Sequence, residues 1–171
     1  MASAKDVAEE MLRANGARDT FSLHKLLYYA QAYHLAKHRT PLFDDAIEAW
    51  TNGPTVRTLF QEHRGEYRVE TVGGDVAALD REQLESISEV LELYGSQSDR
   101  WLVNQTHLEA PWREAREGLA PDERGSRVIS IESILKFYEP IFNDSEIEGG
   151  RSDAASERGL TGAQIRQRYD F

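Results

Sequence analysis

The sequence has no cysteine among its 171 residues, so disulfide bonds, thiol catalysis and cysteine-ligated zinc are excluded. It also has no apolar run approaching the roughly 18 residues of a membrane-spanning helix. The first twelve residues, MASAKDVAEEML, carry acidic side chains where a signal peptide needs a basic start and an apolar run. These features predict a cytoplasmic protein with no membrane segment.

Basic side chains are few, with 20 lysines and arginines against 30 acidic residues and a formal net charge of -10. This balance disfavours broad contact with a nucleic-acid backbone or with an anionic membrane surface. It fits a basic protein partner, although many acidic proteins are simply soluble. Hydrophobic residues make up 40% of the chain, which is enough for a core, and the length favours one compact domain.

Signatures of phosphate binding and of catalysis are also missing. Gly73-Gly74 is not followed by Lys-Ser/Thr, and neither a GxGxxG pattern nor a nucleophile-elbow spacing occurs. His34 and His38 have a spacing that can bind zinc on a helix, but the HLAK sequence lacks the glutamate base of a metalloprotease. The alternative is one histidine facing the core and one at the helix end, and no metal or cofactor is predicted.

Carboxylates at Asp44-Asp45, followed by Glu48, are the nearest approach to an acid–base pair. Acid–base catalysis requires two carboxylates in different environments across a cleft, which adjacent residues in a polar loop satisfy poorly. A solvated turn or a helix cap therefore fits these residues better.

Hydrophobic periodicity predicts a mainly α, compact single-domain helical bundle over residues 1–144, with possible short β segments. Expected helices cover residues 3–15, 21–38, 54–63, 80–95, 99–107, 111–117 and 131–142, and expected strands lie near 46–50 and 66–72. The helix over 21–38 is apolar around its circumference, which predicts a central position. Ser22 is its expected N-cap, with Phe21 packing on Leu26 as a hydrophobic staple.

The helix after Asp80 is amphipathic, and Asp80 with Gln83 forms a predicted capping box. Its expected buried stripe is Leu84, Ile87, Leu91 and Tyr94. Its expected exposed face is acidic and consists of Glu82, Glu85, Glu89 and Glu92. Such a face is either solvated or presents negative charge to a basic partner.

Residues 145–171 have few large apolar side chains and are predicted to form a flexible C-terminal tail. Near its end, Ile165, Tyr169 and Phe171 fall on one helical face. This pattern predicts a short amphipathic segment that orders against a partner.

Two stretches combine a tryptophan with a proline-started helix, IEAWTNGPTV and QTHLEAPWREAREG. In the first, Trp50 anchors the preceding segment, Asn52 or Gly53 caps a helix, and Pro54 takes its first position. In the second, His107 bonds backbone at a helix end and Trp112 is a buriable anchor. Both stretches are structural on composition alone, and both remain candidates for partner contact.

With the segment LHKLLYYAQAYHLAKHRTPLFDD, these stretches resemble the Panacea antitoxin domain, the SocA-like family. The resemblance lies in a K-L-x-Y-Y block, an A-W-x-x-G-P block and a T-H-x-x-x-P-W-x-x-A-R block, in the family's order from Leu23 to Gly118. Thr55 departs from the Gly-Pro-Val of many members. The resemblance implies a compact helical domain of bacterial or phage origin that neutralises a cognate toxin by direct protein contact, with no catalytic role. For SocA-like members it further implies delivery of the toxin to a ClpXP-type protease.

Two other functions remain as alternatives at this point. One is a metal-dependent or acid–base hydrolase that uses His34, His38, His107 or the Asp44 cluster. The other is a DNA-binding regulator of its own operon, which the net charge disfavours.

Overall fold

A computed structural model describes residues 1–143. Seven α-helices and two small two-stranded sheets make up this part of the chain, which confirms the prediction of a mainly helical fold. The predicted tail, with Ile165, Tyr169 and Phe171, lies outside the described residues, so the boundary at residue 144 remains a prediction.

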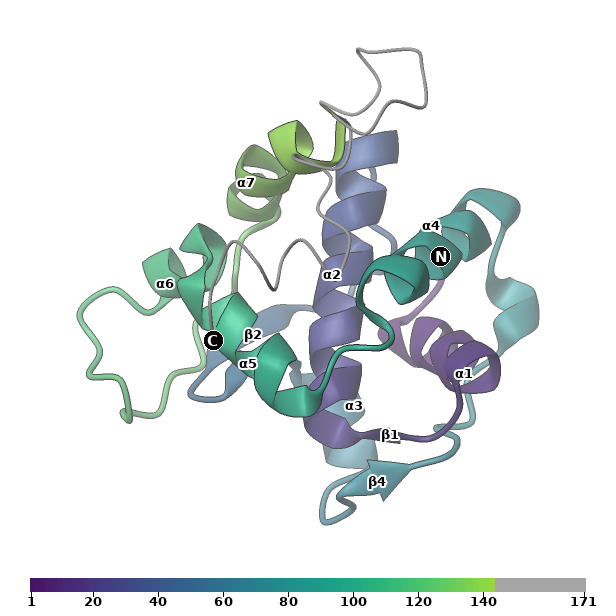
Figure 1. Ribbon diagram of the computed structural model, residues 1–171, viewed down its shortest axis with the longest axis horizontal. Helices are drawn as coiled ribbons and strands as arrows, with labels where there is room; N and C mark the ends of the chain where they lie inside the picture. The colour runs from purple at the N-terminus through teal and green to yellow at the C-terminus, as the bar shows by residue number, and fades with distance from the viewer. Residues whose placement is uncertain (144–171) are drawn as a thin grey trace.

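Helix α2 (Thr20–His38) runs through the middle of the domain, as its apolar sequence predicts (Figure 1). The helix begins one residue before its expected start at Phe21, and its N-cap is Asp19 and not Ser22. The carboxylate of Asp19 accepts hydrogen bonds from the Ser22 backbone N–H at 2.8 Å and from the Ser22 hydroxyl at 2.6 Å. Because the aspartate already caps the helix, Phe21 lies within its first turn and is 38% exposed instead of forming a staple on Leu26.

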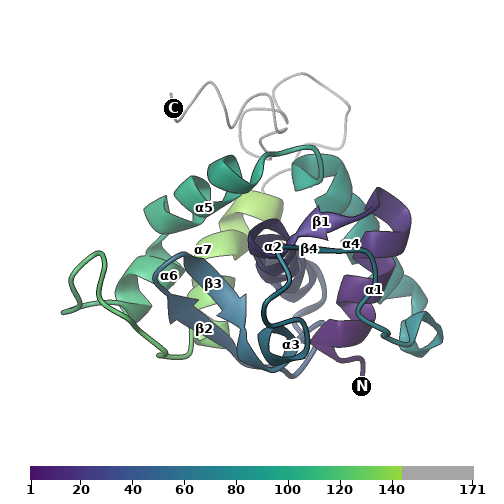
Figure 2. The ribbon, with the colours of Figure 1, turned by 90° about the horizontal axis from the view of Figure 1, so that it is seen from below.

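The other helices surround α2, which Figure 2 shows nearly end-on. Helices α1 and α4 lie on one side, and α5, α6 and α7 lie on the other (Figures 1 and 2). Their bounds are α1 (Ala4–Asn15), α4 (Arg81–Tyr94), α5 (Asp99–Leu108), α6 (Ala110–Ala115) and α7 (Ile131–Asn143). These bounds confirm five helices expected from periodicity, including the proline near the start of α6.

Helix α4 begins with the predicted capping box of Asp80 and Gln83. Its buried face is rotated from the expected stripe, because Leu84 is 37% exposed while Gln83 and Ser86 are buried. Both polar side chains bond to groups in the core. The Gln83 amide donates to the Leu42 carbonyl at 3.2 Å, and the Ser86 hydroxyl lies 2.9 Å from Nδ1 of His34.

The segment around Trp50 forms a β-hairpin of β2 (Ile47–Trp50) and β3 (Gly53–Val56). The strand near 46–50 was predicted, but the helix start at Pro54 was wrong. Pro54 lies opposite Ala49 in β3, and helix α3 begins only at Arg57 and ends at Glu62. The far edge of β2 bonds to residues 127–129, where the Ala49 N–H donates to the Arg127 carbonyl at 2.8 Å. Strand β3 is thus an edge strand, a position that tolerates proline.

A second sheet pairs β1 (Arg18–Asp19) with β4 (Arg68–Val69), so only two residues of the strand expected over 66–72 are in a ladder. The following residues are held by a side chain. The carboxylate of Glu9 in α1 accepts from the backbone N–H groups of Val72 and Gly73 at 2.8 and 2.9 Å. A 3-10 turn, η1 (Val76–Ala78), then leads into α4.

A buried carboxylate lies where α2, α5 and α7 meet. Tyr29 of α2 donates its hydroxyl to Glu109 at 3.0 Å, Gln105 of α5 donates its amide at 3.3 Å, and Tyr138 of α7 also donates to this carboxylate. Burial raises the pKa of Glu109 to about 7, against the opposing effect of these three donors. The three helices are thereby joined through one polar group inside the core.

Candidate functional site

The three sequence blocks that resemble the family, namely the central helix, the Trp50 stretch and the Trp112 stretch, meet at the β2–β3 hairpin. From one side, the Val56 N–H donates to Nδ1 of His24 in α2 at 3.2 Å. From the other side, the Trp112 indole N–H donates to the Trp50 carbonyl at 2.9 Å, and the Arg116 guanidinium donates to the Ala49 carbonyl at 3.1 Å. The hairpin is therefore fixed between α2 and α6 by hydrogen bonds to its backbone.

His107 and Trp112 belong to this support and not to an open surface. Their rings stack at 4.0 Å with an interplanar angle of 9°, and the guanidinium carbon of Arg116 lies 5.2 Å from the centre of the Trp112 ring. Burial, together with the charges of Lys25 and Arg116, lowers the pKa of His107 to about 4. His107 is thus neutral at pH 7.

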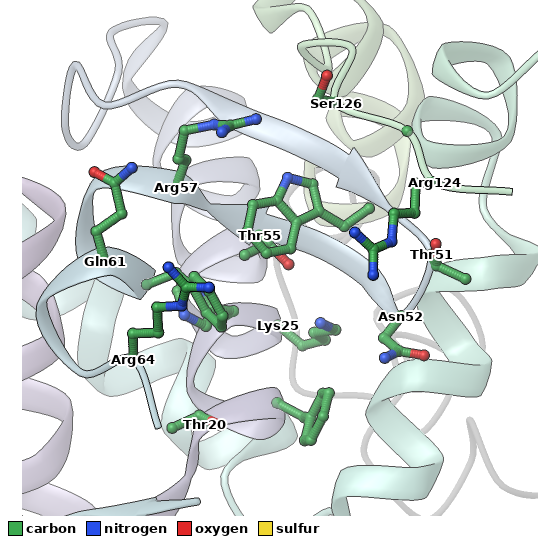
Figure 3. Close-up of a pocket in the computed structure, with 15 residues that line it drawn as sticks. Thr20, Lys25, Thr51, Asn52, Thr55, Arg57, Gln61, Arg64, Arg124 and Ser126 are labelled. Carbon is green, nitrogen blue, oxygen red and sulfur yellow. The ribbon is translucent and has the colours of Figure 1, made fainter. Parts of the chain in front are cut away.

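A pocket of about 710 Å³ opens between the hairpin, the start of α2 and helix α3 (Figure 3). Its lining has four basic side chains and no acidic one. The lining residues are Thr20, Phe21, His24, Lys25, Trp50, Thr51, Asn52, Thr55, Arg57, Phe60, Gln61, Arg64, Arg124, Gly125 and Ser126. In a protein with a net charge of -10, this concentration of positive charge marks the pocket as the candidate site.

Lys25 is the buried cation of the pocket, with 1% of its surface exposed. Its amino group makes no hydrogen bond or ion pair with any of the described residues, and the Phe21 ring centre is 6.0 Å away. Burial lowers the pKa of Lys25 to about 7, and the charge of Asp19 opposes that effect.

Gly53 makes room for the lysine. A Cβ atom at this position would lie 2.7 Å from Cε of Lys25 and 2.9 Å from the Thr106 hydroxyl oxygen, both too close for a real side chain. The φ of Gly53 is +104°, a conformation that glycine adopts without strain. The Asn-Gly-Pro sequence thus serves to pass the hairpin backbone over the end of Lys25.

The arginines of the pocket differ in their pairing. Arg57 donates two hydrogen bonds to Glu48, at 2.8 and 2.9 Å, and the Trp50 indole donates to the same carboxylate at 2.7 Å. Arg64 and Arg124 are exposed and form no ion pair within residues 1–143. Figure 3 shows them on opposite sides of the pocket with Lys25 between them.

The residues considered for a hydrolase do not form one site. Only the rings of His34 and His38 lie close together, with 4.5 Å between their centres. The described part of the chain has no group of three or more metal-ligating side chains. His34 bonds to Ser86 in the core, and His38 lies 3.4 Å from Glu82. The Asp45 carboxylate accepts from the Ala4 N–H at 2.8 Å and from the Thr58 hydroxyl at 2.6 Å, so it has a structural role.

The other candidates for partner contact are divided between surface and interior. Asn52 is exposed at the tip of the hairpin and Trp50 is partly buried, whereas Pro54 and Trp112 are buried. Four glutamates of α4 are exposed, as expected: Glu82, Glu85, Glu89 and Glu92. Their role in binding remains a prediction.

Lys25, Arg64 and Arg124 were missed as site residues by sequence reasoning. A signal existed for Lys25, because it is a charged residue in a helix predicted to be central and covered on several sides. The arginines lie in separate segments, and only the folded hairpin and the loop before α7 bring them to one pocket.

Taken together, a central helix covered by helices, a tethered hairpin and a basic pocket define a small helical domain with a recessed candidate site. The sequence model of the family described as antitoxin SocA-like, Panacea domain, matches residues 23–113. This match covers more than half of the chain, and the protein belongs to that family. No curated protein and no solved structure matched the chain. No helix in residues 1–143 is long and apolar enough to cross a membrane.

Proposed function

We propose that this protein is an antitoxin that neutralises a cognate toxin in the cytoplasm by direct protein–protein contact. The match to the SocA-like Panacea domain over residues 23–113 carries this proposal. Membership of an antitoxin family suggests a non-enzymatic role, in which the protein acts by occupying the surface of its partner.

Two surfaces are available for the toxin, on different sides of α2 (Figure 2). One is the glutamate face of α4, where Glu85 and Glu89 are exposed. The other is the hairpin tip with Asn52, beside the basic pocket. We propose the α4 face as the principal contact, because its charge suits a basic partner and the net charge of the protein, -10, would steer that partner toward it.

Co-expression with the neighbouring reading frame tests this function. The expected result is that the neighbour arrests growth alone, that this protein restores growth, and that the two co-purify. A harmless neighbour, or two proteins that do not co-purify, would contradict the proposal.

Charge reversal at two positions locates the contact. The Glu85→Lys, Glu89→Lys variant is expected to lose protection, whereas Asn52→Lys, which adds the same kind of charge at the hairpin tip, is expected to keep it. Circular dichroism of both variants checks that the helical fold is intact. The reverse pattern would assign the toxin to the hairpin side.

As a refinement, we propose that the protein delivers the bound toxin to a ClpXP-type protease through the segment that contains Ile165, Tyr169 and Phe171. A variant ending at Asn143 tests this idea by the half-life of the toxin in cells. The expected result is a longer half-life with neutralisation by binding retained. An unchanged half-life that still depends on the antitoxin would remove this segment from the mechanism.

A further inference from the structure

The floor of the basic pocket holds a buried lysine whose amino group forms no hydrogen bond or ion pair with residues 1–143. Lys25 is 1% exposed and bonds to no described side chain or carbonyl, although its amino group lines an open pocket. A buried charge is stable only when it is paired, and a buried lysine that faces a cavity can obtain its partner from a ligand. An anion bound in the pocket would supply such a partner for Lys25.

Arginines at the edge of the pocket add further positive charge around Lys25. Arg64 and Arg124 are exposed on opposite sides of Lys25 and make no ion pair with the described residues, while Arg57 is already occupied by Glu48 (Figure 3). Three basic side chains that form no ion pair within residues 1–143 thus surround one space, and its lining has no acidic side chain. Guanidinium groups match phosphate oxygens in geometry as well as in charge.

The walls are aromatic and the volume is that of a small-molecule site. Phe21, Trp50 and Phe60 line the pocket beside the cations, and about 710 Å³ lies within the range of known ligand pockets. A carboxylate from a protein partner brings a single negative charge and fills only a small part of this space. A phosphate or diphosphate with a planar ring supplies two or three charges and an apolar surface for the walls.

We propose that the pocket binds a nucleotide of the nucleoside mono- or diphosphate class, with its phosphate on Lys25 between Arg64 and Arg124 and its base against the aromatic wall. This activity is additional to toxin neutralisation and does not depend on it. It makes the protein a receptor for a small phosphorylated metabolite.

Titration calorimetry on the full-length protein tests the proposal with three probes, ADP, pyrophosphate and adenosine. We expect ADP to bind at least tenfold more tightly than either fragment, because only ADP uses both the cations and the aromatic wall. Lys25→Met is expected to weaken ADP binding on the order of tenfold to a hundredfold, the effect of losing one buried charge-assisted bond. Lys136→Met, which removes an exposed lysine of α7, is the matched control and leaves binding unchanged.

A second variant tests the proposal without changing any buried side chain, so a loss of binding cannot come from a disturbed core. Arg64→Gln with Arg124→Gln changes only exposed side chains, and it is expected to weaken ADP and pyrophosphate binding together while adenosine binding stays as it was.

Three outcomes overturn the proposal. The first is no ADP binding at 1 mM, and the second is equal ADP affinity in the wild type and Lys25→Met. The third is pyrophosphate binding as tightly as ADP, which would reject the nucleotide class. If ADP fails to bind but Lys25→Met abolishes co-purification with the toxin, the pocket holds an acidic side chain of the toxin instead.

Discussion

Replacing Lys25 with methionine should change how the stability of the protein depends on pH. Methionine has a similar length without the charge, so it removes the cost of burying an ammonium group. The pKa of Lys25 is lowered from 10.5 to about 7 in the folded protein. Because the unfolded chain then binds more protons, wild-type stability rises with pH between these two values.

The magnitude follows from the size of this pKa shift. Each unit is worth about 1.4 kcal/mol, so the lowered pKa of Lys25 costs about 5 kcal/mol of stability below pH 7. Between pH 7.5 and 9.5, the linkage relation gives the wild type a gain of about 2 to 3 kcal/mol from this residue alone. The methionine variant lacks this gain, and it is more stable than the wild type at pH 7.5.

Urea unfolding followed by tryptophan fluorescence at pH 7.5, 8.5 and 9.5 measures this difference. Ordinary carboxylates and guanidinium groups do not titrate in this window. The histidines beside Lys25 have lowered pKa values and stay neutral. The groups that face the lysine are Asp19, His24, Arg64, His107 and Arg124. Lys136→Met should keep the wild-type slope, and equal slopes for the wild type and Lys25→Met would refute a buried ammonium.

Three further changes test other contacts. Gly53→Ala should lower the free energy of unfolding by roughly 1 to 3 kcal/mol through backbone strain, and by more through its clash with Lys25. Gly16→Ala is the control, because Gly16 also has a positive φ but no atom within 4 Å of an added Cβ, so urea unfolding should show the strain alone. The wild-type Glu109 carboxylate should lower the free energy of unfolding by about 3 kcal/mol as pH rises from 4.5 through its folded pKa of about 7. Glu109→Gln should remove this decline, and identical pH profiles of stability for the two proteins would refute it. Trp112→Phe should cost about 1 kcal/mol or more by losing its bond to the hairpin carbonyl; no change in thermal unfolding would contradict that role.

Much of the helical framework is predictable from the sequence because its signals are local. The capping box at Asp80 and the apolar circumference of α2 identify those helices without knowledge of their neighbours. At Pro54 the local signal misleads, because proline is equally compatible with the first turn of a helix and with an edge strand. The choice depends on residues 127–129, which pair with β2 from far along the chain.

The pocket was less predictable than the fold for a related reason. Its cations come from α2, from the start of α3 and the turn after it, and from the loop before α7, so no motif in the sequence records their proximity. Trp50 and Asn52 were identified as candidates through their motif, and both line the pocket. Lys25 carried a signal in its helical position, but the significance of that position depends on the open space beside it.

The position of α7 in the chain has a consequence for synthesis on the ribosome. This last described helix covers the face of α2 that contains Tyr28 and Tyr29, and the Asn143 amide donates to the Ala36 carbonyl at 2.8 Å across 107 residues of sequence. Until residue 143 has left the ribosome, that apolar face has no cover and the nascent domain is exposed to aggregation and proteolysis. The face of α2 on which α7 packs is therefore covered only when the end of the helical domain emerges.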